Sequence, residues 1–108
     1  MKRCFRIDER DNVATMLTDA SQEVVEVVGA ADCPTIEVRG QAPLAHKVAL
    51  REITAGGRVI KFGVAIGIAT KDILPGEWVH LHNCRSQVDE RSSKFEDGVE
   101  SGSEANYA

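Results

Sequence analysis

Residues 46–83 read HKVALREITAGGRVIKFGVAIGIATKDILPGEWVHLHN, and this stretch decides the fold. Its apolar residues come in short runs that often alternate with polar residues, which is typical of β-strands. Glycine, proline and aspartate separate the runs and favour tight turns. The stretch therefore predicts short strands that are joined by turns.

A weak internal repeat runs through the same stretch. Each copy has a polar residue, an aliphatic residue, a turn, and then a strand whose first aliphatic side chain enters the core. Two copies are residues 52–59 and 72–79, and residues 41–48 resemble them less closely. Because units this short cannot form a solenoid, they indicate a compact β domain in which bent hairpins fold over one another.

The whole body of the chain is rich in valine and isoleucine, so the predicted fold class is all-β. Polar turns are expected at Asp8–Asp11 and at Gly29–Pro34, where Gly29 can take positive φ. Helices look minor. The expected strands are Cys4–Ile7, Asn12–Leu17, Glu23–Val28, Thr35–Val38, Lys47–Ala49, Val59–Lys61, Ala65–Ala69 and Trp78–Asn83.

Composition narrows the functional classes. A chain of 108 residues with a formal net charge of −4 fits one small domain, and it carries no bulk positive field for nucleic acid or for an anionic membrane. No run is apolar enough for a membrane span, and charges come too early for a signal peptide, so the chain is expected to be cytoplasmic. The three cysteines lack C-x-x-C spacing, which argues against disulfides and a zinc knuckle.

The predicted domain covers residues 1–84. Residues 85–108 are acidic overall, contain Ser, Gly and Asn, and have almost no aliphatic side chains. Such a segment cannot bury enough apolar surface to offset the entropy of ordering it. We therefore expect residues 85–108 to be a disordered, acidic flexible tail or linker.

Four segments in a fixed order resemble a known family, and they are His46-Lys47-Val48-Ala49-Leu50, Val59-Ile60-Lys61-Phe62-Gly63, Ile66-Gly67 and Val79-His80-Leu81-His82-Asn83. Together they look like the SAF domain of the altronate and galactarate dehydratases, to which the small subunit of sulfolactate sulfo-lyase is closely related. The resemblance covers about residues 3–84 and implies a β-clip fold. Two positions differ from the family pattern: Ala45 stands where the family usually has glycine, and Trp78 where it often has a third histidine.

The resemblance also implies a division of labour. A large catalytic subunit would carry most of a lyase active site, often with a divalent metal such as Fe, Mn or Mg that both subunits share. The small chain would be inactive alone and would help to bind a hydroxy-acid substrate from which water or sulfite is eliminated. The alternatives are a stand-alone, non-catalytic module that binds a carbohydrate acid or a protein partner, and self-association into a homo-oligomer through exposed strand edges.

The candidate site residues are mostly histidines and lysines. On a strand over residues 78–84, the side chains of Trp78, His80, His82 and Cys84 would share one face, with Val79 and Leu81 in the core. The His80 and His82 imidazoles could bind a metal ion, hydrogen-bond a polyhydroxy acid or be catalytic, one of them as a general base, whereas the alternative is a solvated polar face. The expected substrate-binding residues are His46, Lys47 and Lys61, with Lys47 as a carboxylate clamp.

Overall fold

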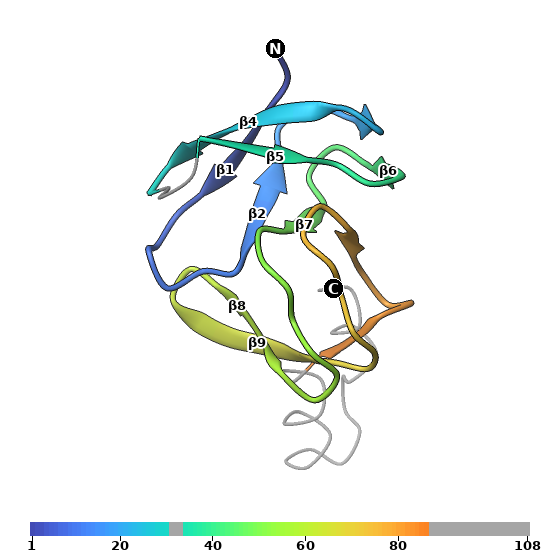
Figure 1. Cartoon of the computed structure of the whole chain (residues 1–108). Helices are drawn as coiled ribbons and strands as arrows, with labels where there is room; N and C mark the ends of the chain where they lie inside the picture. Colours follow the sequence, from blue (N-terminus) through green and yellow to red (C-terminus); the bar gives the residue numbers. More distant parts are fainter. Residues whose placement is uncertain (31–33, 87–108) are drawn as a thin grey trace, which may run out of the picture.

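The computed structural model describes residues 1–30 and 34–86, and all the regular secondary structure in them is β-strand (Figure 1). These residues include no helix, and hence none long and apolar enough to cross a membrane. The predicted all-β class is confirmed. The strands are β1 (Arg3–Arg6), β2 (Val13–Met16), β3 (Ala20–Ser21), β4 (Val24–Gly29), β5 (Thr35–Glu37), β6 (Gln41–Ala42), β7 (Lys47–Ala49), β8 (Arg58–Lys61), β9 (Val64–Ala69), β10 (Trp78–Val79) and β11 (Cys84–Ser86).

The strands form three sheets that fold over one another. The largest has the order β10-β7-β2-β1-β4-β5, in which β1 and β4 run parallel and the other neighbours run antiparallel. A second sheet has the order β11-β9-β8, and β3 pairs with β6. In Figure 1, β4 and β5 lie at one end and the β8–β9 hairpin at the other, with β7 between them. Strand β10 therefore forms an edge of the large sheet next to this central strand.

The internal repeat appears in the structure as three turns of one kind. Residues 43–46, 54–57 and 74–77 each close with a hydrogen bond from the fourth amide to the first carbonyl, at 3.1, 2.7 and 3.1 Å. The third residue has positive φ in every case: Ala45 (71°), Gly56 (89°) and Gly76 (89°). A type II turn requires this geometry, which favours glycine. Ala45 thus adopts the conformation for which the family's glycine is suited.

The strands that leave these turns bury equivalent side chains. The eighth residue of each copy has no exposed surface, and these residues are Val48, Val59 and Val79. The second residue of each copy is also buried, and these residues are Ala42, Ile53 and Ile73. Ile53 and Ile73 exchange both of their backbone hydrogen bonds, at 2.9 and 2.8 Å. The copies 52–59 and 72–79 therefore lie side by side in antiparallel orientation.

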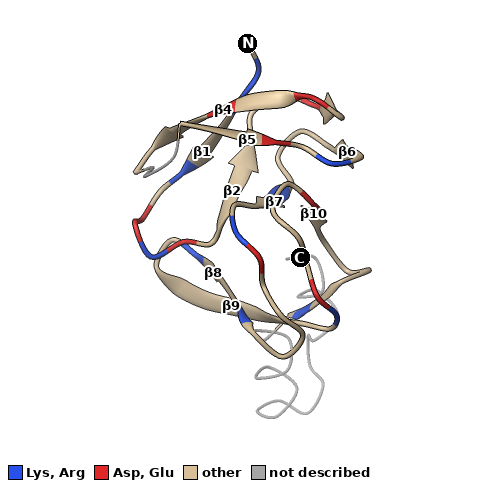
Figure 2. Ribbon diagram, in the orientation of Figure 1, with Lys and Arg blue, Asp and Glu red and all other residues tan. Residues whose placement is uncertain are grey.

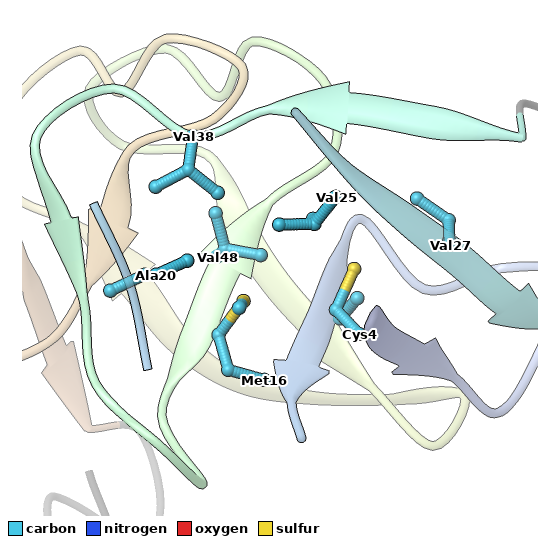
Figure 3. Packing of buried hydrophobic residues seen from close by; sticks show 9 residues of the cluster. Cys4, Met16, Ala20, Val25, Val27, Val38 and Val48 are labelled. Atoms are coloured by element: carbon cyan, nitrogen blue, oxygen red, sulfur yellow. The ribbon is translucent and has the colours of Figure 1, made fainter. Parts of the chain in front are cut away.

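Two clusters of buried side chains flank β2 and β7. Neighbouring residues of these strands alternate between the clusters, as the pleat of a strand requires: Val48 belongs to one and Ala49 to the other. Figure 3 shows the first cluster, whose labelled members are Cys4, Met16, Ala20, Val25, Val27, Val38 and Val48. The second cluster consists of Val13, Ala49, Ile53, Val59, Ala69, Ile73 and Val79.

The expected strand Trp78–Asn83 is wrong beyond Val79. Strand β10 ends at Val79, and a turn follows over residues 80–83. The cause is the Asn83 side chain, which captures backbone groups that a strand would use in its ladder. Val79 is buried as expected, but Leu81 is 58% exposed instead of lying in the core.

The other expected strands are confirmed, with ends that shift by no more than one residue. The turn at Asp8–Asp11 is present, with a 3.0 Å hydrogen bond from the Asp11 amide to the Asp8 carbonyl, and Gly29 has φ of 92°. The short strands β3, β6 and β11 were not expected. Strand β11 pairs with β9 as far as Ser86, two residues past the expected domain limit at residue 84. The rest of the expected tail, residues 87–108, lies outside the described residues, as does Cys33.

Charged residues of both signs are interspersed along the ribbon (Figure 2). Within the described residues, the ion pairs lie mostly near the N-terminal end of the chain, such as Lys2 with Glu23 and Arg10 with Asp8. These pairs are exposed or half-buried, so each contributes little to stability. The charges that concern function lie elsewhere, around β7 and β10.

Candidate functional site

Four aromatic rings gather where β7 begins and β10 ends. The two strands pair antiparallel with Trp78 opposite Val48, and this register brings the residue before β7, His46, beside Trp78. The turn after β10 then returns two further rings to the same place. We call this group the ring cluster, and its members are His46, Trp78, His80 and His82.

The rings contact one another face to face and edge to face. Trp78 and His80 stack with centroids 5.4 Å apart and planes 9° from parallel. The His46 ring stands edge-on, 5.5 Å from Trp78 and 4.8 Å from His80, and His82 tilts against Trp78 at 5.1 Å. The Trp78 indole N–H donates to His46 Nδ1 at 3.1 Å. Neutral His46 therefore carries its own proton on Nε2, which leaves an N–H donor on the other side of the ring.

The Asn83 side chain fixes the backbone of the ring cluster through hydrogen bonds to Trp78 and His80. It is 3% exposed, its Oδ1 accepts the His80 amide at 3.0 Å, and its Nδ2 donates to the Trp78 carbonyl at 2.9 Å. The amides of Asn83 and Cys84 in turn donate to the His80 carbonyl, at 3.1 and 2.9 Å. These bonds fix the direction in which the His80 side chain leaves the turn.

His80 has the most unusual environment of the three histidines. Its Nδ1 is buried and has no hydrogen-bond partner among the described residues. Burial lowers the pKa of His80, and the charges of His46, Lys47 and His82 lower it further. The imidazole is therefore neutral near pH 7, which is the form that accepts a proton or binds a metal ion.

Lys47 and Cys84 lie near His80, and Lys61 lies near Lys47. Lys47 is 4% exposed, and burial lowers its pKa; Cys84 opposes this shift and Lys61 adds to it. Burial likewise raises the pKa of the Cys84 thiol, against the effect of Lys47. The ammonium of Lys61 sits 4.9 Å from the centre of the Phe62 ring. Burial thus lowers the pKa of Lys47, the predicted carboxylate clamp.

A hollow of about 340 Å³ opens on the side of the ring cluster formed by Trp78 and His82. Three segments form its walls, and they lie at residues 39–41, 71–72 and 77–83. Among the lining residues are Arg39, Gln41, Lys71, Trp78, His82 and Asn83. Asp72 and Glu77 also line the hollow.

The prediction of a metal site gains no support from the described residues. Among residues 1–30 and 34–86, no three His, Cys, Asp or Glu side chains come close enough together to hold a metal ion. His80 and His82 could supply at most part of a ligand set, which further ligands from outside these residues would have to complete. Metal binding by His80 and His82 therefore stays a prediction.

The structure brings most of the predicted site residues together. His46, His80 and His82 meet in the ring cluster, Lys47 lies within electrostatic reach of His80, and Lys61 within reach of Lys47. Trp78, His80 and His82 do lie together as expected, although a turn gathers them rather than a strand face. Cys84 lies by Gly67, where a Cβ would come within 2.7 Å of the Cys84 sulfur.

Sequence reasoning missed Arg39 and Lys71. Arg39 reaches the hollow because its amide donates to the Gly76 carbonyl at 2.9 Å and its Nε to the Pro75 carbonyl at 3.0 Å. Such a contact between distant segments has no local pattern. For Lys71 a signal was present, because it directly precedes the repeat copy that leads to Trp78.

Known proteins resemble this chain over the described domain. The profile of the altronate/galactarate dehydratase SAF domain matches residues 2–87. An altronate dehydratase of Escherichia coli (strain K12) is 40% identical over 84 residues, which cover 78% of this chain and 16% of that protein. The (2R)-sulfolactate sulfo-lyase subunit alpha of Chromohalobacter salexigens is 39% identical over 51 residues, which cover 47% of this chain and 54% of that subunit.

An altronate dehydratase of Bacillus subtilis (strain 168) extends the comparison, with 34% identity over 89 residues that cover 82% of this chain and 17% of that protein. The chain thus spans only 16 to 17% of the length of these two dehydratases. The matched residues 2–87 include every strand described above and the whole ring cluster. The chain belongs to the altronate/galactarate dehydratase SAF domain family.

Proposed function

We propose that this chain is the accessory SAF module of a lyase that acts on hydroxy acids, of the altronate or galactarate dehydratase type or of the sulfolactate sulfo-lyase type. It would help a large catalytic subunit to bind the substrate. The observation that carries the proposal is the ring cluster, in which the half-buried, neutral His80 has a buried Nδ1 without a hydrogen-bond partner among the described residues. A structural role alone gives no reason for a buried polar atom to be left unpaired.

The chemistry of the ring cluster suits an elimination. A base removes the proton from the carbon next to the carboxylate, and the electron pair left there forms the double bond as the hydroxyl or sulfonate on the neighbouring carbon departs. Neutral His80 has the form of a base, and His82, which is exposed, could protonate a leaving hydroxyl. His46, through its Nε2–H, and the lysines Lys47 and Lys61 would bind substrate oxygens.

The rest of the active site would belong to the large subunit. The sulfo-lyase relatives are named as alpha subunits, so those enzymes contain more than one subunit. A divalent metal, Fe, Mn or Mg, would assist the leaving group. Most of its ligands would come from the large subunit, since the described residues of this chain do not form a metal site by themselves. We place the complex in the cytoplasm, which the composition favours.

An assay of the chain with and without its large subunit tests the proposal. Altronate, galactarate and sulfolactate are the substrates to offer, with release of the keto acid or of sulfite as the signal. We expect no turnover by the isolated chain and turnover of one substrate by the complex. Full turnover by the isolated chain would rule out an accessory role, and a complex without lyase activity on any hydroxy acid would rule out the function.

A second candidate is a non-catalytic module that binds a carbohydrate acid, and the hollow of about 340 Å³ beside Trp78 and His82 supports it. Calorimetric titration of the chain with sugar acids, and separately with Mg²⁺, Mn²⁺ or Fe²⁺, separates the two candidates. Binding of a sugar acid without any effect of the chain on turnover by the large subunit would favour the second. Self-association through the edge strands β5 or β10 stays a prediction.

A further inference from the structure

We infer that the hollow beside Trp78 and His82 is a binding site for the carboxylate end of a polyhydroxy acid, with Arg39 and Lys71 as the groups that bind the anion. The hollow lies on the Trp78 and His82 side of the ring cluster. The inference depends on the proposed function only for the choice of ligand. The charges, the free polar groups and the size of the hollow each support it.

Two cationic side chains line the hollow, and they are Arg39 and Lys71. Asp72 and Glu77 also line it, but Asp72 Oδ1 accepts the Ala55 amide at 2.9 Å and Glu77 Oε1 accepts the Leu74 amide at 3.1 Å. One oxygen of each carboxylate is thus bonded to a turn of the repeat. Within the part of the chain that the structure describes, neither Arg39 nor Lys71 forms an ion pair.

Arg39 is held in place without using its anion-binding end. Its Nε donates to the Pro75 carbonyl at 3.0 Å, and its amide is bonded to the Gly76 carbonyl at 2.9 Å. The terminal nitrogens of the guanidinium make no hydrogen bond within the described residues. A guanidinium that is anchored through Nε and open at its far end can bind a carboxylate with two parallel hydrogen bonds. Lys71 adds a second, mobile positive charge.

The remaining walls suit hydroxyl groups and carbon atoms. The side-chain amide of Gln41 and the exposed ring of His82 have no hydrogen bond within the described residues, so both can form hydrogen bonds to hydroxyl groups. Trp78 offers an aromatic ring against which the carbon chain of a sugar acid can pack. Asn83 contributes no such contact, because both ends of its amide are used by the turn. A volume of about 340 Å³ is large enough for a six-carbon acid.

Trp78 is the only tryptophan of the chain, so its fluorescence reports on the hollow directly. The full chain would be titrated with galactarate, which has two carboxylates and four hydroxyls. Adipate, which lacks the hydroxyls, and galactitol, which lacks the carboxylates, are the matched probes. We expect a saturable change in fluorescence with galactarate up to about 10 mM, a weaker response to adipate, and none to galactitol.

Charge-removing variants tie the signal to the hollow. The Lys71→Gln and Arg39→Gln substitutions together should weaken galactarate binding at least about tenfold. Lys71→Gln alone should weaken it less, and it serves as the folded reference because Lys71 has no bond to lose within the described residues. Arg58→Gln removes an exposed arginine that does not line the hollow, and it should change the affinity by less than about twofold.

Three results would overturn the inference. They are no response of Trp78 to galactarate, equal affinity of the wild type and the Arg39→Gln, Lys71→Gln variant, or displacement of galactarate by sulfate at the same concentration, which would indicate a general anion site. None of these involves turnover, so each leaves the proposed function untouched. Normal galactarate binding by a chain whose complex lacks lyase activity would instead overturn the proposed function alone.

Discussion

The repeat copies 52–59 and 72–79 have the same backbone and carry different side chains. Each has a glycine at φ of 89° in its turn, a buried isoleucine at its second position and a buried valine at its eighth. The first copy continues into the plain β8–β9 hairpin, whereas the second continues into the ring cluster. The difference teaches that one scaffold serves both regions, and that function depends on the side chains placed at the end of the second.

An asparagine side chain also makes equivalent hydrogen bonds to the backbone of each copy. The Asn83 amide bonds the carbonyl of Trp78 and the amide of His80 at 2.9 and 3.0 Å. The Asn12 amide makes the same two bonds to the equivalent positions of β8, at 2.9 and 2.8 Å. Matched substitutions can therefore test structure and function separately.

The largest expected effect comes from filling the glycines of the two turns. A Cβ on Gly76 would collide with the Glu37 carbonyl, whereas a Cβ on Gly56 meets nothing within 4 Å. Both substitutions would also strain a residue at positive φ. We expect Gly76→Ala to lower the free energy of unfolding by more than about 3 kcal/mol and Gly56→Ala by about 1 kcal/mol, as measured by urea denaturation. Equal losses would show that β5 does not pack on the last turn as described.

The two asparagines come next. Asn83→Ala leaves a half-buried carbonyl and a half-buried amide without their partner, which should cost about 2 to 3 kcal/mol in the free energy of unfolding. Asn12→Ala should cost about 1 to 2 kcal/mol, because Asn12 is more exposed. Only Asn83→Ala should change the fluorescence spectrum of Trp78. A change of similar size in the Asn12→Ala variant would contradict the separation of the two regions.

The pH dependence of stability distinguishes the two copies. The residue that follows the copy is a titratable histidine, His80, in one case and Ile60 in the other. The pKa of folded His80 is lowered by burial, so at moderately acid pH the unfolded chain binds a proton that the folded protein does not. The free energy of unfolding should therefore decrease as the pH falls below about 6.5, by at most about 1.4 kcal/mol per pH unit. His80→Gln should reduce this slope, and an unchanged slope would show that His80 is not shielded from solvent.

The smallest expected effect concerns the turn at residues 43–46. Ala45 has φ of 71°, a conformation that costs an L-residue energy and glycine almost none. Ala45→Gly should therefore raise the free energy of unfolding by about 0.5 to 1 kcal/mol in urea denaturation, after the greater flexibility of glycine in the unfolded chain is subtracted. A loss of stability would mean that the Ala45 methyl group makes packing contacts that outweigh the strain.

The sequence predicts the scaffold well, because most strands show apolar residues bounded by glycine, proline or aspartate. It fails at residues 80–83, where the order Val79-His80-Leu81-His82 alternates as a strand does. The Asn83 side chain decides for the turn instead, and the choice depends on hydrogen bonds that no apolar pattern contains. Strands β3 and β6, of two residues each, are too short to show a period.

The candidate site divides in the same way. The three histidines were found because they lie close to β7 and β10 in the sequence, and the pairing of these strands brings them together. Arg39 could not be found, because it reaches the site through hydrogen bonds to the backbone of a turn whose residues are more than thirty positions away. Tertiary contacts of this kind leave no periodic signal in either segment.

The most direct test of the central claim is the elimination rate of the complex between this chain and its large subunit, with variants of both copies. We predict that His80→Ala with His82→Ala lowers kcat at least about 100-fold, the usual size of acid–base contributions. We predict that Asn12→Ala, which loosens the equivalent part of the other copy, leaves kcat within about twofold at a temperature where the variant is folded. Equal activities of these two variants would contradict the account.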